Sequence, residues 1–156
     1  MRITSIVAVV LTLGSISTAM AAGSTSSSSR PAAKPSTYQQ GVSAVKAGDY
    51  GRALSLFEKV VRANPRNADA WNYIGFSHRN LKQFDQALAA YTKALDIDPE
   101  HRGANEYLGE LYLQTGDLEK ARARLKTLDS ACIFGCEEYD DLKQAIKKYE
   151  AADKRG

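Results

Sequence analysis

A period of 34 residues is the feature of this sequence that most restricts its fold. Glycine, alanine, large apolar residues and proline each recur at that distance. The small residues are Gly41, Gly75 and Gly109, together with Ala53, Ala87 and Ala121. The larger ones are Tyr50, Phe84 and Leu118, then Phe57, Tyr91 and Leu125, and the prolines are Pro65 and Pro99, with Ile133 in the third place. Agreement of several residue classes on one period indicates a stack of repeated units.

The unit from Trp71 to Pro99 shows the pattern most completely. It contains, in order, Trp71, Ile74, Gly75, His78, Phe84, Ala87, Tyr91, Ala94 and Pro99. This arrangement closely resembles a tetratricopeptide repeat, and the resemblance extends over about residues 38–131. It implies an all-α solenoid built from three antiparallel helix pairs, at about 38–65, 68–99 and 102–131.

Local signals mark where the expected helices end. A glycine followed by an aspartate, at 48–49 and again at 116–117, offers a permissive helix end and an oxygen that caps the next helix. The prolines in the pairs at 64–65 and 98–99 cannot continue a helical hydrogen-bond ladder. Several positions depart from the family pattern: Thr37 and Gln40 in the first unit, His78 in the second, and Asn105 in the third.

Residues 132–156 follow the last repeat and are interpreted as a turn and a capping helix. Tyr139, Leu142, Ile146 and Tyr149 fall at helical spacing and form an apolar stripe. Acidic residues come first and basic residues later, which matches the helix dipole. We therefore expect a helix that covers the exposed apolar edge of the last repeat.

The first 22 residues have the layout of a secretory signal peptide. Arg2 precedes a mostly apolar run over residues 3–16, and small residues follow at 19–22. The run is shorter than the roughly 20 residues that a transmembrane helix needs. We expect cleavage near residue 22, no membrane span in the mature chain, and an exported protein, which in a bacterial cell means the periplasm. Residues 23–37, a mixture of Ser, Pro and Ala, are expected to form a flexible linker.

Cys132 and Cys136 lie at the junction of the third repeat and the capping helix. In an exported chain two cysteines are more often oxidised than free, so we predict a structural disulfide between them. A thiol-redox or metal-handling role is the alternative. Three residues separate the cysteines where thioredoxin-type motifs have two, and haem attachment would require histidine where Glu137 stands. A zinc site needs four ligands, and His78 and His101 belong to different helix pairs.

The charge of the chain does not indicate a nucleic-acid partner. The formal net charge is +3 at pH 7, and loss of Arg2 with the signal peptide removes one of 21 basic side chains, against 18 acidic ones. Nucleic-acid binding requires basic residues clustered on one face. The sequence contains no recognisable Ser-His-Asp arrangement, glycine-rich phosphate loop or paired-carboxylate site. We therefore expect neither an enzyme nor a requirement for a cofactor or metal.

In the tetratricopeptide family, ligands usually lie along the first helix of each pair, which lines a concave groove. By position, the resemblance assigns these residues to the groove: Tyr38, Gln39, Asn72, Tyr73, Phe76, Arg79, Glu106, Tyr107 and Glu110. Their aromatic rings suit peptide recognition, and the alternative is that several simply pack between helices. Some family members clamp a terminal carboxylate with Lys, Asn and Arg at set groove positions. The corresponding positions of this chain hold no basic pair: they are Tyr38, Val42, Tyr73, Gly103 and Glu106. Glu106 and Glu110 would repel a carboxylate, so we expect a neutral, basic or aromatic ligand.

These features together predict an exported, non-enzymatic interaction module or scaffold that binds a protein or peptide through the groove. Two alternatives stay open. One is redox or metal chemistry at Cys132 and Cys136, and the other is a structural scaffold that self-associates through an uncapped repeat edge. The chain is expected to be a monomer or to self-associate weakly.

Overall fold

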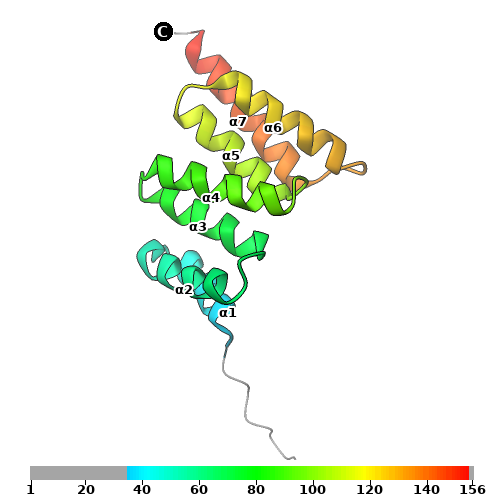
Figure 1. Cartoon of the computed structure of the whole chain (residues 1–156). Helices are drawn as coiled ribbons and strands as arrows, with labels where there is room; N and C mark the ends of the chain where they lie inside the picture. The colour runs from blue at the N-terminus through cyan, green and yellow to red at the C-terminus, as the bar shows by residue number, and fades with distance from the viewer. Residues whose placement is uncertain (1–34, 155–156) are drawn as a thin grey trace, which may run out of the picture. The chain divides into compact units, whose positions relative to one another are not determined.

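The computed structural model describes residues 35–154, which form seven α-helices (Figure 1). The helices are α1 (Thr37–Lys46), α2 (Tyr50–Ala63), α3 (Ala68–Asn80), α4 (Phe84–Ile97), α5 (Arg102–Gln114), α6 (Leu118–Ala131) and α7 (Glu137–Asp153). No strand occurs in this part of the chain, so the predicted all-α fold is confirmed. The predicted signal peptide, residues 1–22, lies outside the described residues, as does most of the predicted linker, residues 23–37.

Helix α1 begins one residue earlier than the sequence pattern predicts. The Gln39 N–H donates to the Ser36 hydroxyl at 3.2 Å, and the Ser36 N–H donates to Gln39 Oε1 at 2.8 Å. This reciprocal arrangement satisfies two donors at the start of the helix. Thr37, which the composition places in the linker, is therefore the first residue of α1.

The turns inside the three helix pairs share one backbone shape. Residues 48, 82 and 116 have positive φ angles, 73° at Gly48, 62° at Lys82 and 84° at Gly116. The aspartate side chains that follow the glycines, Asp49 and Asp117, each accept a hydrogen bond from a backbone N–H of the next helix at 3.1 Å. Lys82 differs because it carries a Cβ atom, which disfavours the left-handed region.

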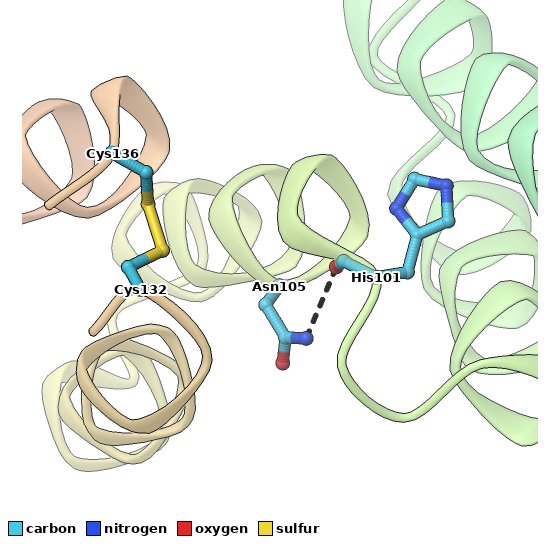
Figure 2. Close-up of a disulfide and its surroundings, with 4 residues drawn as sticks. All are labelled: His101, Asn105, Cys132 and Cys136. Atoms are coloured by element: carbon cyan, nitrogen blue, oxygen red, sulfur yellow. Dashed lines mark hydrogen bonds between the residues drawn. A yellow bond between two sulfur atoms is a disulfide. The ribbon is translucent and has the colours of Figure 1, made fainter. Parts of the chain in front are cut away.

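The turns between pairs are held by a second recurring contact. The Trp71 Nε1–H donates to the Pro65 carbonyl at 2.9 Å. Asn105, one period later, donates from Nδ2 to the Pro99 carbonyl at 3.0 Å. It also donates to the His101 carbonyl at 3.1 Å (Figure 2). Asn105 therefore replaces the tryptophan of the repeat but keeps its hydrogen bond to the preceding turn.

The odd-numbered helices form one side of the stack and the even-numbered helices form the other. Helix α3 contacts α1 and α5, and α5 contacts α7, whereas α2, α4 and α6 do not contact one another. Close approach within a pair depends on glycine. A Cβ atom at Gly41 would lie 2.8 Å from the Phe57 ring, and one at Gly75 would lie 2.6 Å from the Tyr91 ring. Both rings are fully buried, so a larger residue at these glycines forces the helices apart.

Helix α7 occupies the place of the first helix in a fourth unit. Leu142 and Ile146 continue the 34-residue spacing from Leu108 and Tyr112, and both are buried. A Cβ atom at Gly109 would lie 2.5 Å from a Leu142 methyl group, so the cap fits directly onto the third pair. Because α7 contacts both α5 and α6, the predicted capping helix is confirmed. None of the described helices is both long and apolar enough to cross a bilayer.

Candidate functional site

Aromatic side chains from three successive odd-numbered helices meet on one face of the stack. Tyr38 of α1 and Tyr73 of α3 have ring centroids 6.0 Å apart, and Phe76 of α3 and Tyr107 of α5 have centroids 4.9 Å apart. All four residues are partly exposed. We call the surface around them the odd-helix face. The structure thus brings together the aromatic residues that the repeat pattern assigns to a groove.

Aromatic residues of the even-numbered helices brace this face from behind. Phe57 stacks on Tyr73 with centroids 4.8 Å apart and an interplanar angle of 6°. Tyr50 meets Phe76 at 6.0 Å, and Tyr91 meets Tyr107 at 6.5 Å. Sequence reasoning treated Tyr50, Phe57 and Tyr91 as repeat signature only and missed this second role. Rings held in this way offer a rigid contact surface that loses little side-chain entropy on binding.

Arg79 of α3 is the basic residue that the sequence places on this face, and its charge is already paired. Its Nη1 donates to Glu110 Oε2 at 2.5 Å. Its guanidinium carbon lies 5.6 Å from the centroid of Phe76 and 5.4 Å from that of Tyr107, within range of cation–π attraction. Arg79 is only 9% exposed. It therefore orders the two rings and Glu110, and it does not offer a free cation to a carboxylate.

Glu106 of α5 is a buried acid at the same place, with 7% of its surface exposed. Burial, reinforced by the charges of Glu110, Asp141 and Glu138, raises the pKa of Glu106 to about 8, and Arg79 opposes this rise. Two of these acids belong to α7, so the capping helix contributes to the electrostatics of the odd-helix face. The repeat pattern could not place them, because their position depends on how α7 docks.

The remaining predicted residues have mainly structural surroundings. Asn72 of α3 is buried. A Cβ atom added to Gly103 of α5 would lie 3.0 Å from Asn72 Nδ2, so the Asn72 side chain lies between α3 and α5. Gln39 is exposed, but its side chain takes part in the cap of α1. Burial raises the pKa values of Tyr38 and Tyr107 to about 12, so both phenols stay neutral at physiological pH. Their partner-binding role stays a prediction.

The two histidines act within the scaffold. His101 caps α5, accepting from the Ala104 N–H at Nδ1, and its Nε2 lies 3.0 Å from Asp69 Oδ1 of α3. His78 Nδ1 lies 2.6 Å from Gln83 Oε1. The link from His101 to Asp69 joins the second and third pairs, and sequence reasoning missed it because histidine is an uncommon helix cap.

Cys132 and Cys136 form the predicted disulfide, with Cα atoms 5.6 Å apart (Figure 2). Cys132 is the cap residue that follows α6, and Cys136 is the cap residue that precedes α7, so the bond ties the last repeat to the capping helix. Within residues 35–154, no group of three or more His, Cys, Asp or Glu side chains is arranged to hold a metal ion.

Comparisons with known proteins agree with this architecture. Family models described as tetratricopeptide repeat match residues 38–99 and 78–131. The chain is 39% identical over 120 residues to tetratricopeptide repeat protein 37 of Xenopus laevis, covering 70% of this chain and 8% of that protein. It is 30% identical over 118 residues to small glutamine-rich tetratricopeptide repeat-containing protein 2 of Saccharomyces cerevisiae, covering 74% of this chain and 32% of that protein. The chain thus spans less than a third of either relative.

Solved structures with the same fold include two that contain bound polypeptides. The first TPR of Spaghetti (RPAP3) bound to the HSP90 peptide SRMEEVD superposes with a TM-score of 0.65 at 20% identity, over 74% of this chain and 93% of that one. PcrH in complex with the chaperone binding region of PopD gives a TM-score of 0.64 at 21% identity, over 76% and 90% of the two chains. At these identities the likeness establishes the fold alone.

Proposed function

Since this chain belongs to the tetratricopeptide repeat family, we propose that it is a non-enzymatic interaction module that binds a polypeptide across the odd-helix face. The observation that carries the proposal is the row of braced aromatic rings contributed by α1, α3 and α5. Rigid aromatic surfaces with polar tips dominate the energetics of many protein interfaces. The peptide-bound structures of related fold support a binding role of this kind.

The charge of the face favours a basic or neutral segment with apolar side chains. Three acids, Glu110, Glu138 and Asp141, lie close enough to raise the pKa of Glu106, and Arg79 is already paired with Glu110. A peptide carboxylate would meet net repulsion, whereas a lysine or arginine side chain would meet attraction. This charge pattern supports a cationic ligand and argues against a carboxylate clamp.

A basic ligand would also change the protonation of Glu106. Because the pKa of this buried acid is about 8, the side chain is mostly protonated at pH 7. A cation placed beside it lowers that pKa and releases a proton. Binding of a basic peptide at pH 7 is therefore expected to release protons to the buffer, which calorimetry in two buffers of different ionisation enthalpy would detect.

We further propose that the mature protein acts after export, in the periplasm if the cell is bacterial. The signal-peptide pattern of residues 1–22 motivates this, and a disulfide in so small a domain suits an oxidising compartment. Detection of the chain in a periplasmic extract, beginning near residue 22 by mass spectrometry, would support export. Recovery of the uncleaved chain in the cytoplasm would contradict it.

The binding proposal is tested by affinity capture from the exported fraction. Wild type is compared with Tyr73→Ala/Tyr107→Ala, which removes two aromatic side chains of the face. The matched control is Leu81→Ala/Leu88→Ala, which removes two exposed leucines that are not among the residues of this face. We expect the control to recover the same partners as wild type and the tyrosine variant to lose them. Equal recovery by all three proteins, each verified as folded by circular dichroism, would refute the proposal.

A further inference from the structure

The turn between α6 and α7 displays two large apolar side chains to solvent. Ile133 is 82% exposed and Phe134 is 100% exposed, more than any other large hydrophobic residue among those described. Figure 1 shows this turn projecting beyond the ends of the two helices. We call Ile133 and Phe134 the apolar tip. Contiguous apolar surface that is exposed on a folded domain marks a candidate interaction site, and these two residues are adjacent.

The backbone of the turn holds the tip in one shape. The disulfide between Cys132 and Cys136 closes the loop on both sides of the tip. Within it, the Gly135 N–H donates to the Cys132 carbonyl at 2.8 Å, and Gly135 has a φ of 82°. A preorganised loop loses less conformational freedom when it binds. The disulfide thus presents the tip in addition to joining the last two helices.

A complementary hollow lies elsewhere on the same molecule, between α2, α3 and α4. Its volume is about 410 Å³, and Val61, Trp71, Ile74 and Ala90 line its apolar part. An apolar cavity of about 150 Å³ accommodates a benzene ring. The hollow therefore has space for one phenyl ring and one aliphatic side chain, such as those of Phe134 and Ile133 in the apolar tip.

The tip cannot reach the hollow of its own chain. Helix α6, which carries the tip at its end, contacts only α5 and α7 in the described stack, whereas the hollow lies between α2, α3 and α4. An occupant must come from another molecule.

The charges around the two surfaces are also complementary. Residues 127–142 include five acidic side chains and no basic one, so the tip stands in an acidic region. Arg62 and Lys93 border the hollow, and the single acid there, Glu58, pairs with Arg62 at 3.7 Å. Opposite potentials favour encounter of the two surfaces. The same acidic region would be repelled by an anionic lipid surface, which argues against a membrane as the occupant.

We propose that the apolar tip of one chain inserts into the α2–α4 hollow of a second copy. The contact joins two different surfaces. Two copies that exchange tips close a twofold dimer, whereas copies that pass the tip onward form a ring or an open chain. The odd-helix face of each molecule then stays open to a ligand, because the residues that line the hollow are not the residues of that face. A contact based on two apolar anchors is small and belongs to the weak, concentration-dependent class.

Three single variants of the full chain test this contact by sedimentation equilibrium. Phe134→Asp removes the tip, and Ala89→Glu places a charge in the wall of the hollow at an exposed residue. Leu88→Asp is the control, because it introduces the same charge at a neighbouring exposed residue outside the hollow. Wild type and the control should increase in mass between about 10 µM and about 1 mM, and either test variant should weaken association at least about tenfold.

Mixing the two test variants gives the decisive result. One variant keeps an intact hollow and the other keeps an intact tip, so an equimolar mixture should form a 1:1 heterodimer and nothing larger. The proposal is overturned if wild type remains monomeric throughout the range, if Phe134→Asp associates as well as wild type, or if the mixture stays monomeric. Vesicle binding that depends on Phe134, without self-association, would instead assign the tip to a lipid surface.

Discussion

Replacing Glu106 by glutamine should change how the stability of this domain depends on pH. Burial and the neighbouring acids raise the pKa of Glu106 from 4.5 to about 8 in the folded chain. Between those pH values the folded state binds more protons than the unfolded state, so the free energy of unfolding falls as pH rises. The stability that proton binding by Glu106 contributes to the folded state is fully present below about pH 4.5, and it is lost once the pH exceeds about 8.

The magnitude follows from the two pKa values. One pKa unit corresponds to about 1.4 kcal/mol, so ionisation of Glu106 should destabilise the fold by on the order of 3 kcal/mol between pH 5 and pH 8. Glu106→Gln keeps the shape of the side chain and removes the charge. The variant should resemble wild type at pH 5 and be the more stable protein at pH 8.

Urea unfolding followed by circular dichroism at pH 5, 6, 7 and 8 measures this difference. Glu100→Gln is the matched control, because it removes an exposed acid at the turn before α5. Subtracting the curves of wild type and Glu106→Gln cancels the titration of all other groups. If the two curves run parallel from pH 5 to pH 8, the pKa of Glu106 is not raised in the folded chain, and the reasoning is refuted.

Three further predictions concern the scaffold. Gly75→Ala should destabilise the folded domain by about 1–2 kcal/mol in thermal unfolding, because overpacking against the Tyr91 ring outweighs the gain in helix propensity. The control is Gly51→Ala, which has no atom within 4 Å of its new Cβ and should be neutral or stabilising. Lys82→Gly should raise the melting temperature by about 1–3 °C by relieving a left-handed residue, and a lower melting temperature would refute this. Cys132→Ser/Cys136→Ser should cost on the order of 2 kcal/mol while peptide binding persists. Unchanged stability with lost reductase or metal-dependent activity would instead support the redox or metal alternative.

The helices could be predicted from the sequence because their ends depend on local chemistry. Gly48 and Asp49 end one helix and cap the next with groups that lie within three residues of each other. The turn at Pro65 needs only the proline and a donor six residues later, which Trp71 supplies. Signals of this range survive in a single sequence, and the 34-residue period repeats them.

The odd-helix face could be predicted only in part. The repeat register places Tyr73, Phe76 and Tyr107 on one side of the stack, and the structure agrees. The pairing of Arg79 with Glu110 joins residues 31 apart and depends on how α3 and α5 pack, which no periodic pattern specifies. For that reason sequence reasoning presented Arg79 as a groove residue without showing that its charge is neutralised.

The influence of the capping helix also depends on tertiary packing. The sequence predicts that α7 covers the last repeat, but not that it brings Glu138 and Asp141 toward Glu106. Likewise, the sequence pattern marks Ile133 only as the residue that replaces the proline of the earlier repeats. Its exposure beside Phe134 follows from the shape of the disulfide-closed turn. Both features lie at the junction where the 34-residue pattern ends, so the repeat gives no template for them.

The most direct test of a polypeptide-binding face is NMR mapping of the isotope-labelled domain during titration with a captured partner segment. A basic, aromatic-containing segment should shift backbone and side-chain signals of Tyr73, Phe76 and Tyr107, and Tyr73→Ala/Tyr107→Ala should abolish the shifts. An acidic segment of the same length should leave the spectrum unchanged. Shifts confined to α2, α4 and α6, or equal binding of the acidic segment, would contradict the account.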